Sequence, residues 1–147
     1  MHITVHAGEW GGPENIEQAI NLLGAERIGH GVRIMEDGSL VGQAQEHQVA
    51  FEVCITSNYQ SGVVADLHEH PLKKMIAAGL NVTINTDDPS ISQITLSDEY
   101  QTAYEQLGLS LEMLHERVLA AVQAAFLPAA DRKILANSLE GEFPNLD

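Results

Sequence analysis

The chain has 147 residues, which is enough for one domain with a core, and 44% of them are hydrophobic, which argues against disorder. Its 21 Asp and Glu residues outnumber 7 Lys and Arg residues, so the formal net charge is −14. No cluster of basic residues is visible that could contact phosphates. Nucleic acids and anionic membrane surfaces are therefore disfavoured as partners.

Short β-branched runs alternate with helix-like stretches up to residue 85, and this pattern is typical of parallel βα units. We expect strands over residues 3–5, 27–31, 50–55 and 81–85. Between them we expect helices over about 13–23, 39–47 and 71–78. After Pro89 the strands stop, and we expect three further helices over about 96–107, 110–124 and 128–139.

Local signals support these helices. Pro13 suits the first position of the first helix, Gly24 suits its C-terminal cap, and Ser39 and Ser110 suit N-caps. In the first helix, four apolar residues are spaced to lie on one face, and they predict its buried stripe: Ile16, Ala19, Ile20 and Leu23. A later helix, which Gly108 would end, is marked by Leu96, Tyr100, Ala103 and Leu107; the helix after it has as its predicted inner face Leu111, Leu114, Val118 and Ala121.

Four parallel strands alone would leave two open edges and a core on one side only. We therefore expect an α/β fold in which residues 1–147 supply the C-terminal half of a single catalytic (β/α)₈ barrel domain. The N-terminal half would be missing from this chain or supplied by a partner chain.

The single cysteine, Cys54, lies in a strand-like run and cannot form an internal disulfide, so we interpret it as a small buried hydrophobe. A reducing, cytoplasmic location fits this composition. No apolar run approaches the about 20 residues that span a bilayer. Met1 leads directly into a strand rather than into the basic region of a signal peptide.

Polar signatures follow all four predicted strands. They are His6-Ala7-Gly8-Glu9, Gly29-His30-Gly31, Thr56-Ser57-Asn58 and Thr86-Asp87-Asp88-Pro89. In a barrel of βα units, catalytic groups come from the C-terminal ends of several strands. Two histidines, a glutamate and an aspartate pair at that edge favour metal-assisted hydrolysis.

His6 is a candidate metal ligand, and Glu9 lies past the flexible Gly8, where it could act as an acid or base. A lone histidine at a strand end is more often structural, but its combination with Gly8 and Glu9 favours a functional site. His2 would lie about 13 Å from His6 along a strand, which is too far to bind the same ion.

His30 stands between two glycines, which would let the backbone approach its imidazole closely. The alternative is a turn that happens to contain a histidine. Asp87 and Asp88 are adjacent at a strand end, so their side chains should point to different sides. One could bind metal while the other faces substrate, although Asp-Asp-Pro also occurs in ordinary turns.

Other polar residues are weaker candidates. Ser57 and Asn58 could cap loops, and we expect the residues 68–70 to form the exposed start of a helix before Pro71. Trp10 and Tyr59 could line the mouth of a pocket or pack in the core.

Taken together, these motifs resemble the adenosine deaminase family in order and spacing, from about Ile3 to Leu139. The stretch from Asn85 to Tyr100 looks more like adenosine deaminase than the related adenine or AMP deaminases. The resemblance implies a zinc-dependent (β/α)₈ barrel of the metal-dependent hydrolase type. Such an enzyme converts adenosine or deoxyadenosine to inosine and ammonia in purine salvage.

The resemblance also implies roles for individual residues. His6 and Asp87 match zinc ligands, and Glu9 matches the acid that protonates the purine ring. His30 matches the residue that orients the attacking water. Asp88 matches the carboxylate that hydrogen-bonds N7 of the purine, and we expect a backbone role for Gly8.

This chain departs from the family pattern in two ways. It lacks the His-X-His pair that supplies two further zinc ligands and a glycine that contacts the purine, so alone it should not bind its one zinc ion tightly. Ile55 stands where the family often has proline. An adenine or other aminopurine deaminase and a non-catalytic half-barrel that needs a partner chain remain as alternatives.

Overall fold

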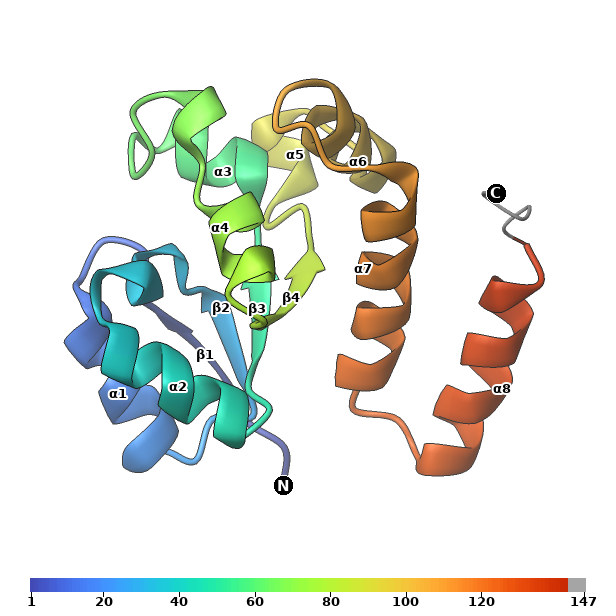
Figure 1. Cartoon of the computed structure of the whole chain (residues 1–147), viewed down its shortest axis with the longest axis horizontal. Coiled ribbons are helices and arrows are strands. Elements are labelled where there is room, and N and C mark those ends of the chain that lie inside the picture. Colours follow the sequence, from blue (N-terminus) through green and yellow to red (C-terminus); the bar gives the residue numbers. More distant parts are fainter. Residues whose placement is uncertain (143–147) are drawn as a thin grey trace.

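The computed structural model describes residues 1–142, and its centre is a single sheet of four parallel strands (Figure 1). The strands are β1 (Thr4–Ala7), β2 (Arg27–His30), β3 (Ala50–Val53) and β4 (Asn81–Ile84). The sheet order is β1-β2-β3-β4, so each strand pairs with the next one along the chain. This is the arrangement that successive βα units predict.

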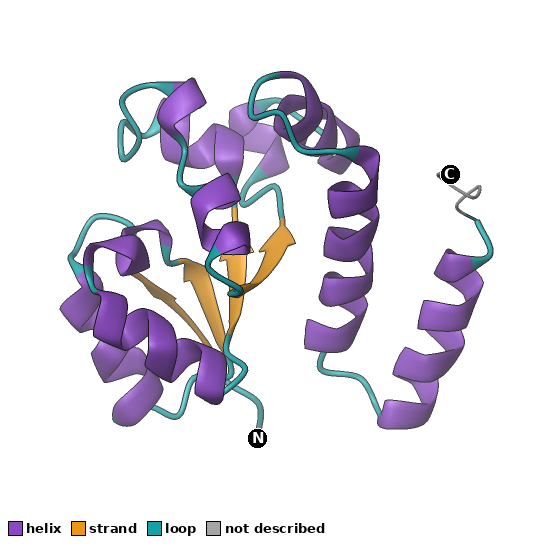
Figure 2. Ribbon diagram, in the orientation of Figure 1, coloured by secondary structure: helices purple, strands orange, loops and turns teal. Residues whose placement is uncertain are grey.

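Eight α-helices and two short 3₁₀ helices surround this sheet within residues 1–142 (Figures 1 and 2). Helices on the outer face of the sheet are α1 (Pro13–Asn21), α2 (Gly38–Glu46) and α4 (Leu72–Ala77). Those beyond the carboxyl ends of the strands are α3 (Ile55–Gln60), α5 (Pro89–Ser92) and α6 (Leu96–Glu105). The last two are α7 (Leu111–Ala124) and α8 (Ala129–Glu140), and the 3₁₀ helices are η1 (Val32–Glu36) and η2 (Leu67–Glu69).

The hydrophobic core lies between the outer face of the sheet and the helices. Alternate strand residues point to this face, where most are buried and Val5 of β1 is half-buried. The strand members of this core are Ala7, Ile28, Phe51, Val53, Val82 and Ile84. Its helix members include Ile16, Ala19, Ile20, Leu40, Ala44, Leu72 and Met75. Burial of each large side chain contributes about 1.5–3 kcal/mol relative to exposure.

The opposite, inner face of the sheet is polar. Thr4 Oγ1 donates a 2.8 Å hydrogen bond to Glu52 Oε2, and Arg27 Nε lies 3.3 Å from Glu52 Oε1. The Arg27 guanidinium also lies 3.7 Å from the centre of the Phe126 ring, on which His2 stacks. Residues on alternate positions of the same strands therefore build two chemically different surfaces.

Helix α7 flanks β4, the last strand of the sheet. Ser110 caps this helix, as the sequence predicts, by accepting a 3.1 Å hydrogen bond from the backbone N–H of Met113. Arg117 Nη1 donates to the carbonyl oxygen of Val82 at 3.4 Å. An arginine of the helix thus bonds the backbone of a strand that has no second strand partner within the described residues.

Several predicted boundaries are wrong. The third strand ends at Val53 rather than at Ile55, because Cys54 is the N-cap of a helix that the sequence did not predict. The first helix ends at Asn21, so Leu23, which was predicted in its buried stripe, lies beyond the helix and is exposed. The N-cap of α2 is Asp37, not Ser39: its carboxylate accepts from the backbone N–H of Ser39 at 2.9 Å.

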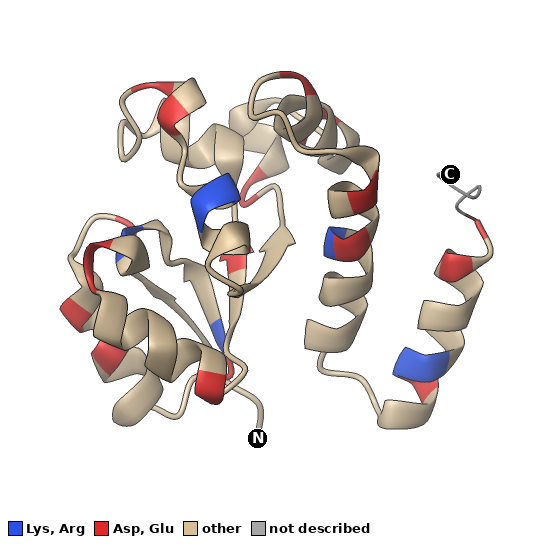
Figure 3. Ribbon diagram, viewed as in Figure 1, with Lys and Arg blue, Asp and Glu red and all other residues tan. Residues whose placement is uncertain are grey.

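Cys54 is buried, as predicted, and burial raises the pKa of its thiol. Within residues 1–142, no helix is both long enough and apolar enough to cross a bilayer. Figure 3 shows that the basic residues of this part of the chain are spread over separate elements.

Candidate active site

Four of the predicted site residues converge beyond the carboxyl ends of the strands. His6 lies in β1, Glu9 follows that strand, His30 ends β2, and Asp87 follows β4. The ligand atoms of His6, Glu9 and His30 all lie within 4.8 Å of one another. His30 Nε2 is 3.6 Å from Glu9 Oε2 and 4.0 Å from Asp87 Oδ2. The sequence pattern therefore predicted a real cluster.

The backbone is unusual at two of these residues. His30 has φ 61° and Asp87 has φ 60°, so both lie in the left-handed region that residues other than glycine seldom adopt. Such conformations are unfavourable and are concentrated at functional sites, where the surrounding structure maintains them. Both strands thus end in a sharp change of direction that turns these side chains toward the cluster.

Two glycines near the cluster stand where a side chain would not fit. A Cβ atom on Gly29 would lie 2.5 Å from Cδ2 of His6, and a Cβ atom on Gly8, which has φ +64°, would lie 2.3 Å from Cδ1 of Ile16. The sequence predicted that glycines beside His30 would allow a close approach. The structure shows that Gly29 instead makes room for the imidazole of His6, whose ring meets that of His30 edge-on at 5.0 Å.

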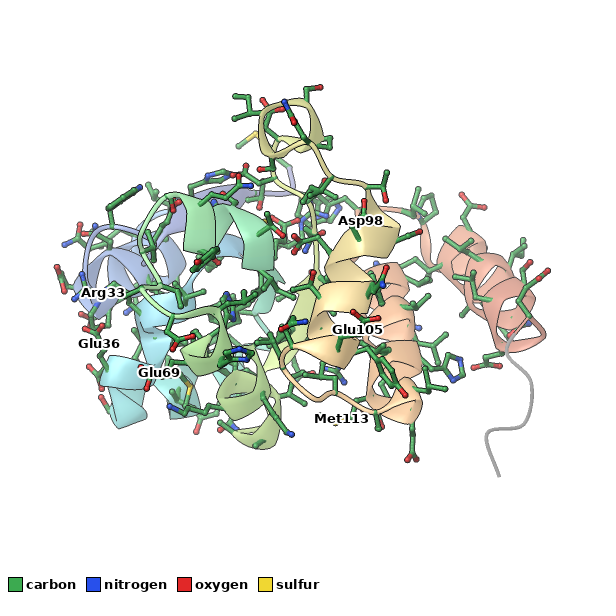
Figure 4. All side chains as sticks on the ribbon, turned by 90° about the horizontal axis from the view of Figure 1, so that it is seen from above. Arg33, Glu36, Glu69, Asp98, Glu105 and Met113 are labelled. Atoms are coloured by element: carbon green, nitrogen blue, oxygen red, sulfur yellow. The ribbon has the colours of Figure 1, made fainter. Side chains whose placement is uncertain are left out.

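The loop after β1 carries Glu9, and an arginine of η1 anchors it. Arg33 donates from Nη1 to the carbonyl oxygen of Trp10 at 2.9 Å and from Nε to Glu36 at 2.8 Å. Arg33 and Glu36 are seen beside each other at the edge of the molecule in Figure 4. This anchor fixes the backbone one residue beyond Glu9, while Gly8 precedes it.

His30 is buried, and its surroundings affect its charge in opposite directions. Burial lowers the pKa of His30 by disfavouring the imidazolium ion, and the carboxylates of Glu9 and Asp87 partly oppose this. The net direction is downward. His30 is therefore held in its neutral form more strongly than an exposed histidine, and it can donate from one nitrogen while accepting at the other.

Helix α3 supplies two side chains that contact the cluster. Ser57 Oγ donates to Asp87 Oδ2 at 2.7 Å, and Asn58 Nδ2 lies 3.1 Å from His30 Nδ1. From the sequence these residues were weak candidates with a possible loop-capping role. Through these contacts they hold Asp87 and His30 in place.

Glu99 of α6 holds helix α3 in place, and its role was not predicted. Its fully buried carboxylate accepts hydrogen bonds from the backbone N–H groups of Ile55 at 2.8 Å and Thr56 at 3.0 Å. Burial raises the pKa of Glu99, although these hydrogen bonds oppose the rise. A carboxylate at the first turn of α3 also complements the helix dipole.

His70 was also missed. The sequence predicted an exposed helix start, but His70 is buried and lies 3.3 Å from the Asn58 side chain through its Nε2 atom. The available signal was the following Pro71, because a residue before proline is disfavoured in a helix. His70 accordingly has an extended backbone, with φ −54° and ψ 130°.

Asp88 bonds the backbone of the helix that follows it. Its Oδ1 atom accepts hydrogen bonds from the backbone N–H groups of Ser90 at 3.0 Å and Ile91 at 3.1 Å, so it is the N-cap of α5. The adjacent Asp87 and Asp88 thus have different partners. The substrate contact of Asp88 and the backbone role of Gly8 stay predictions.

A cavity of about 650 Å³ opens from the cluster along the inner face of the sheet. His6, His30 and Asp87 line its polar end. Its apolar walls come from α6, α7 and α8 and include Tyr100, Val118, Val122, Leu135 and Leu139. This volume is within the range of sites that bind small molecules.

The donors present suit a zinc ion. Imidazole nitrogens and carboxylate oxygens are usual ligands of zinc at about 2 Å, so ligands of one ion lie up to about 4 Å apart. His6, Glu9 and His30 bring two imidazoles and a carboxylate within 4.8 Å of one another, so donors of the types that zinc binds are gathered here. Asp87 adds a second carboxylate, beside the imidazole of His30.

A family model of adenosine deaminases matches residues 1–141. The chain belongs to the adenosine deaminase family. A curated adenosine deaminase from Escherichia coli O1:K1 is 47% identical over 134 residues, which are 91% of this chain and 40% of the relative. The chain thus spans 40% of the length of the curated family members it matches first.

Solved structures confirm the expected fold class. The crystal structure of an adenine deaminase from Arthrobacter aurescens matches 97% of this chain and 43% of its own, with a TM-score of 0.93 and 32% identity. An amidohydrolase from Burkholderia ambifaria with bound Zn matches 97% of this chain and 40% of its own, with a TM-score of 0.89 and 25% identity. The four-stranded sheet is therefore a portion of the barrel fold of this deaminase family.

Proposed function

We propose that the protein is a zinc-dependent adenosine deaminase of purine salvage in the cytoplasm. It would add water to adenosine or deoxyadenosine and release ammonia, leaving inosine or deoxyinosine. The observation that carries this proposal is the convergence of His6, Glu9, His30 and Asp87 in a chain that is 47% identical to a curated adenosine deaminase.

In this proposal His6 and Asp87 hold one zinc ion. When bound, zinc supplies a water whose pKa falls to about 7, so that hydroxide is available at neutral pH. A catalytic zinc site usually has three protein ligands and an open position. We therefore propose that residues 1–147 are the C-terminal half of the catalytic domain. Further ligands would come from an N-terminal half of the barrel or from a partner chain.

The other residues of this chain would act on the purine and the water. Glu9 would donate a proton to the ring as water attacks C6, and its place in a loop after Gly8 allows it to reach the substrate. His30 would orient the attacking water through its Nε2 atom, which already faces Glu9 and Asp87. Asp88 would hydrogen-bond N7, and the backbone at Gly8 would contact the purine.

Adenine deamination is the second candidate, and one observation favours it. The Arthrobacter aurescens structure that matches with a TM-score of 0.93 is an adenine deaminase. Its identity to this chain is 32%, however, against 47% for the adenosine deaminase of Escherichia coli, so we place adenosine first. The two substrates differ by the ribose, and a comparison of their kcat/KM values separates them directly.

The experiment is a deamination assay on the product of the complete gene and, in parallel, on the 147-residue chain. With zinc, the complete protein should release ammonia from adenosine, whereas the chain alone should be inactive. No reaction with any aminopurine would refute a deaminase and leave the non-catalytic half-barrel. Full activity of the chain alone would instead refute the need for further ligands from outside it.

A further inference from the structure

A continuous line of hydrogen bonds runs from helix α4 through the interior to His30. The backbone nitrogen of Leu72 lies 3.1 Å from His70 Nδ1, and His70 Nε2 lies 3.3 Å from Asn58 Oδ1. Asn58 Nδ2 then lies 3.1 Å from His30 Nδ1. The line joins residues from three separate segments of the chain, and it ends at the candidate active site.

Chemistry gives this line a single direction. A backbone N–H can only donate, so the Nδ1 atom of a neutral His70 must accept from Leu72, and the ring proton must sit on Nε2. His70 Nε2–H then donates to Asn58 Oδ1. The amide of Asn58 is thereby oriented with its NH₂ group toward His30, whose Nδ1 must accept.

The surroundings of His30 favour the same proton position independently of Asn58 and His70. With Nδ1 accepting, the proton of neutral His30 is on Nε2, and the nearest charged groups to Nε2 are the acceptors Glu9 Oε2 at 3.6 Å and Asp87 Oδ2 at 4.0 Å. The reverse arrangement would turn a nitrogen lone pair toward two carboxylates. Both ends of the line therefore favour the same tautomer.

The line lies in the protein interior. Asn58 has no exposed surface, His30 is 2% exposed and His70 is 4% exposed. Water cannot readily replace a wrongly oriented partner there, and an unsatisfied polar group is costly. Burial lowers the pKa of His70 to about 4, which keeps this imidazole neutral near pH 7.

We propose that Asn58 and His70 are positioning residues that fix His30 in the tautomer with its proton on Nε2. This N–H then points between Glu9 and Asp87. Its use there, to orient the attacking water, rests on the proposed function. The tautomer itself does not depend on that function, because the donors and acceptors that set it belong to this chain.

Imidazole nitrogen NMR tests the tautomer directly. The product of the complete gene would be labelled with ¹⁵N-histidine, with His30→Gln used to assign the His30 signals. Near neutral pH the wild-type protein should show a protonated Nε2 and an unprotonated Nδ1 for His30. A proton on Nδ1, alone or together with one on Nε2, would overturn the proposal even if every variant below failed to fold.

Asn58→Asp is the sharpest variant, since it keeps the shape of the side chain but removes the NH₂ donor. The new carboxylate can only accept, so the His30 proton should move to Nδ1 in the spectrum. Gln60→Glu is the matched control, because it makes the same change of charge on an exposed residue of α3. An unchanged His30 tautomer in folded Asn58→Asp would contradict the proposal.

Variants of His70 separate positioning from packing. His70→Leu removes the donor to Asn58 and should allow the His30 proton onto Nδ1, whereas His70→Gln can still donate and should restore the wild-type tautomer. In the active enzyme, His70→Leu should lower kcat by about 10–100-fold with KM nearly unchanged. His68→Leu, in exposed η2, should have neither effect.

The NMR spectra test this inference, and the deamination rates test the proposed function, so either one can be rejected without the other. A protein with the predicted tautomer but no deaminase activity would retain this inference and reject the proposed function. A deaminase in which His70→Gln and His70→Leu give the same spectrum as each other would retain the function and reject the inference.

Discussion

The two faces of the sheet differ in chemistry although the same four strands form them. On the outer face, Ile28, Phe51 and Val82 are fully buried under helices α1, α2 and α4. On the inner face, Arg27 and Glu52 pair with each other beside an open cavity, which His6 also lines. Alternation along each strand separates the two faces.

This difference assigns stability mainly to one face and chemistry mainly to the other. The outer face gains free energy from apolar area removed from water. The inner face exposes ionisable groups to a cavity, which contributes little to folding but can bind a cation and a polar substrate. Variants on the two faces should therefore fail in different assays.

The largest effect on folding should come from the outer face. Phe51→Ala removes a fully buried ring and should lower the free energy of unfolding by about 4 kcal/mol, measured by urea denaturation. The neighbouring inner-face variant Glu52→Ala loses the pair with Arg27 and should cost about 1 kcal/mol. Equal losses for both variants would remove the distinction between the faces.

The largest loss of catalytic rate should come from Glu9→Gln. This substitution keeps the shape of the side chain but removes the proton, so kcat for adenosine in the complete, zinc-loaded protein should fall about a thousandfold. Zinc content by atomic absorption and the urea midpoint should not change. Glu14→Gln, in the first turn of α1, is the control, and a near-normal rate for Glu9→Gln would remove it from the acid role.

Acid should destabilise the interior through His70. Burial lowers the pKa of folded His70 to about 4, whereas in the unfolded chain it is about 6.5. Above about pH 6.5 both states are neutral there, and between about pH 6.5 and 4 only the unfolded state gains the proton. Stability should therefore fall with decreasing pH in this window, by up to about 3 kcal/mol in total.

The difference between wild type and His70→Gln isolates this contribution, since other groups titrate in the same range. The variant should lose less stability than wild type when urea denaturation is repeated from pH 7 to pH 4. His68→Gln, two residues away and exposed, is the matched control and should follow wild type. Parallel curves for His70→Gln and wild type would show that His70 does not cause the loss.

The smallest effect should come from Gly29→Ala on the inner face. A Cβ atom there would lie 2.5 Å from Cδ2 of His6, so the imidazole must move, and zinc affinity should fall about tenfold. Competition with a chromogenic chelator measures this affinity. Gly42→Ala, where a Cβ meets nothing within 4 Å, should leave zinc binding unchanged; if both variants bind zinc equally, Gly29 does not serve the site.

The parallel strands and most helices could be predicted from the sequence because their signals are local. Alternating apolar runs identified β1 to β4, and Ser110 correctly indicated the start of α7. The short helices α3 and α5 could not be predicted in this way. They contain few residues and lie at strand ends, where Cys54 and Asp88 act as their N-caps.

The candidate site was predictable only in part for a similar reason. His6, Glu9, His30 and Asp87 follow strands, so strand order alone predicts that they meet. Asn58 and Glu99 lie in helices and His70 lies between two helices, so their contacts depend on the packing of segments that are far apart in the sequence. Glu99 in particular bonds residues 55 and 56, more than forty positions away, and no local pattern could reveal that contact.

The order of the strands also has a consequence for how the sheet assembles. Residues that pair between neighbouring strands are one βα unit apart in the sequence. Examples are Thr4 with Arg27, Arg27 with Ala50, and Ala50 with Asn81. Every pairing therefore closes a loop of similar, modest length, and none must wait for a distant segment. During translation, the strand with which each new strand pairs has already been synthesised, so the sheet can grow strand by strand from β1 to β4.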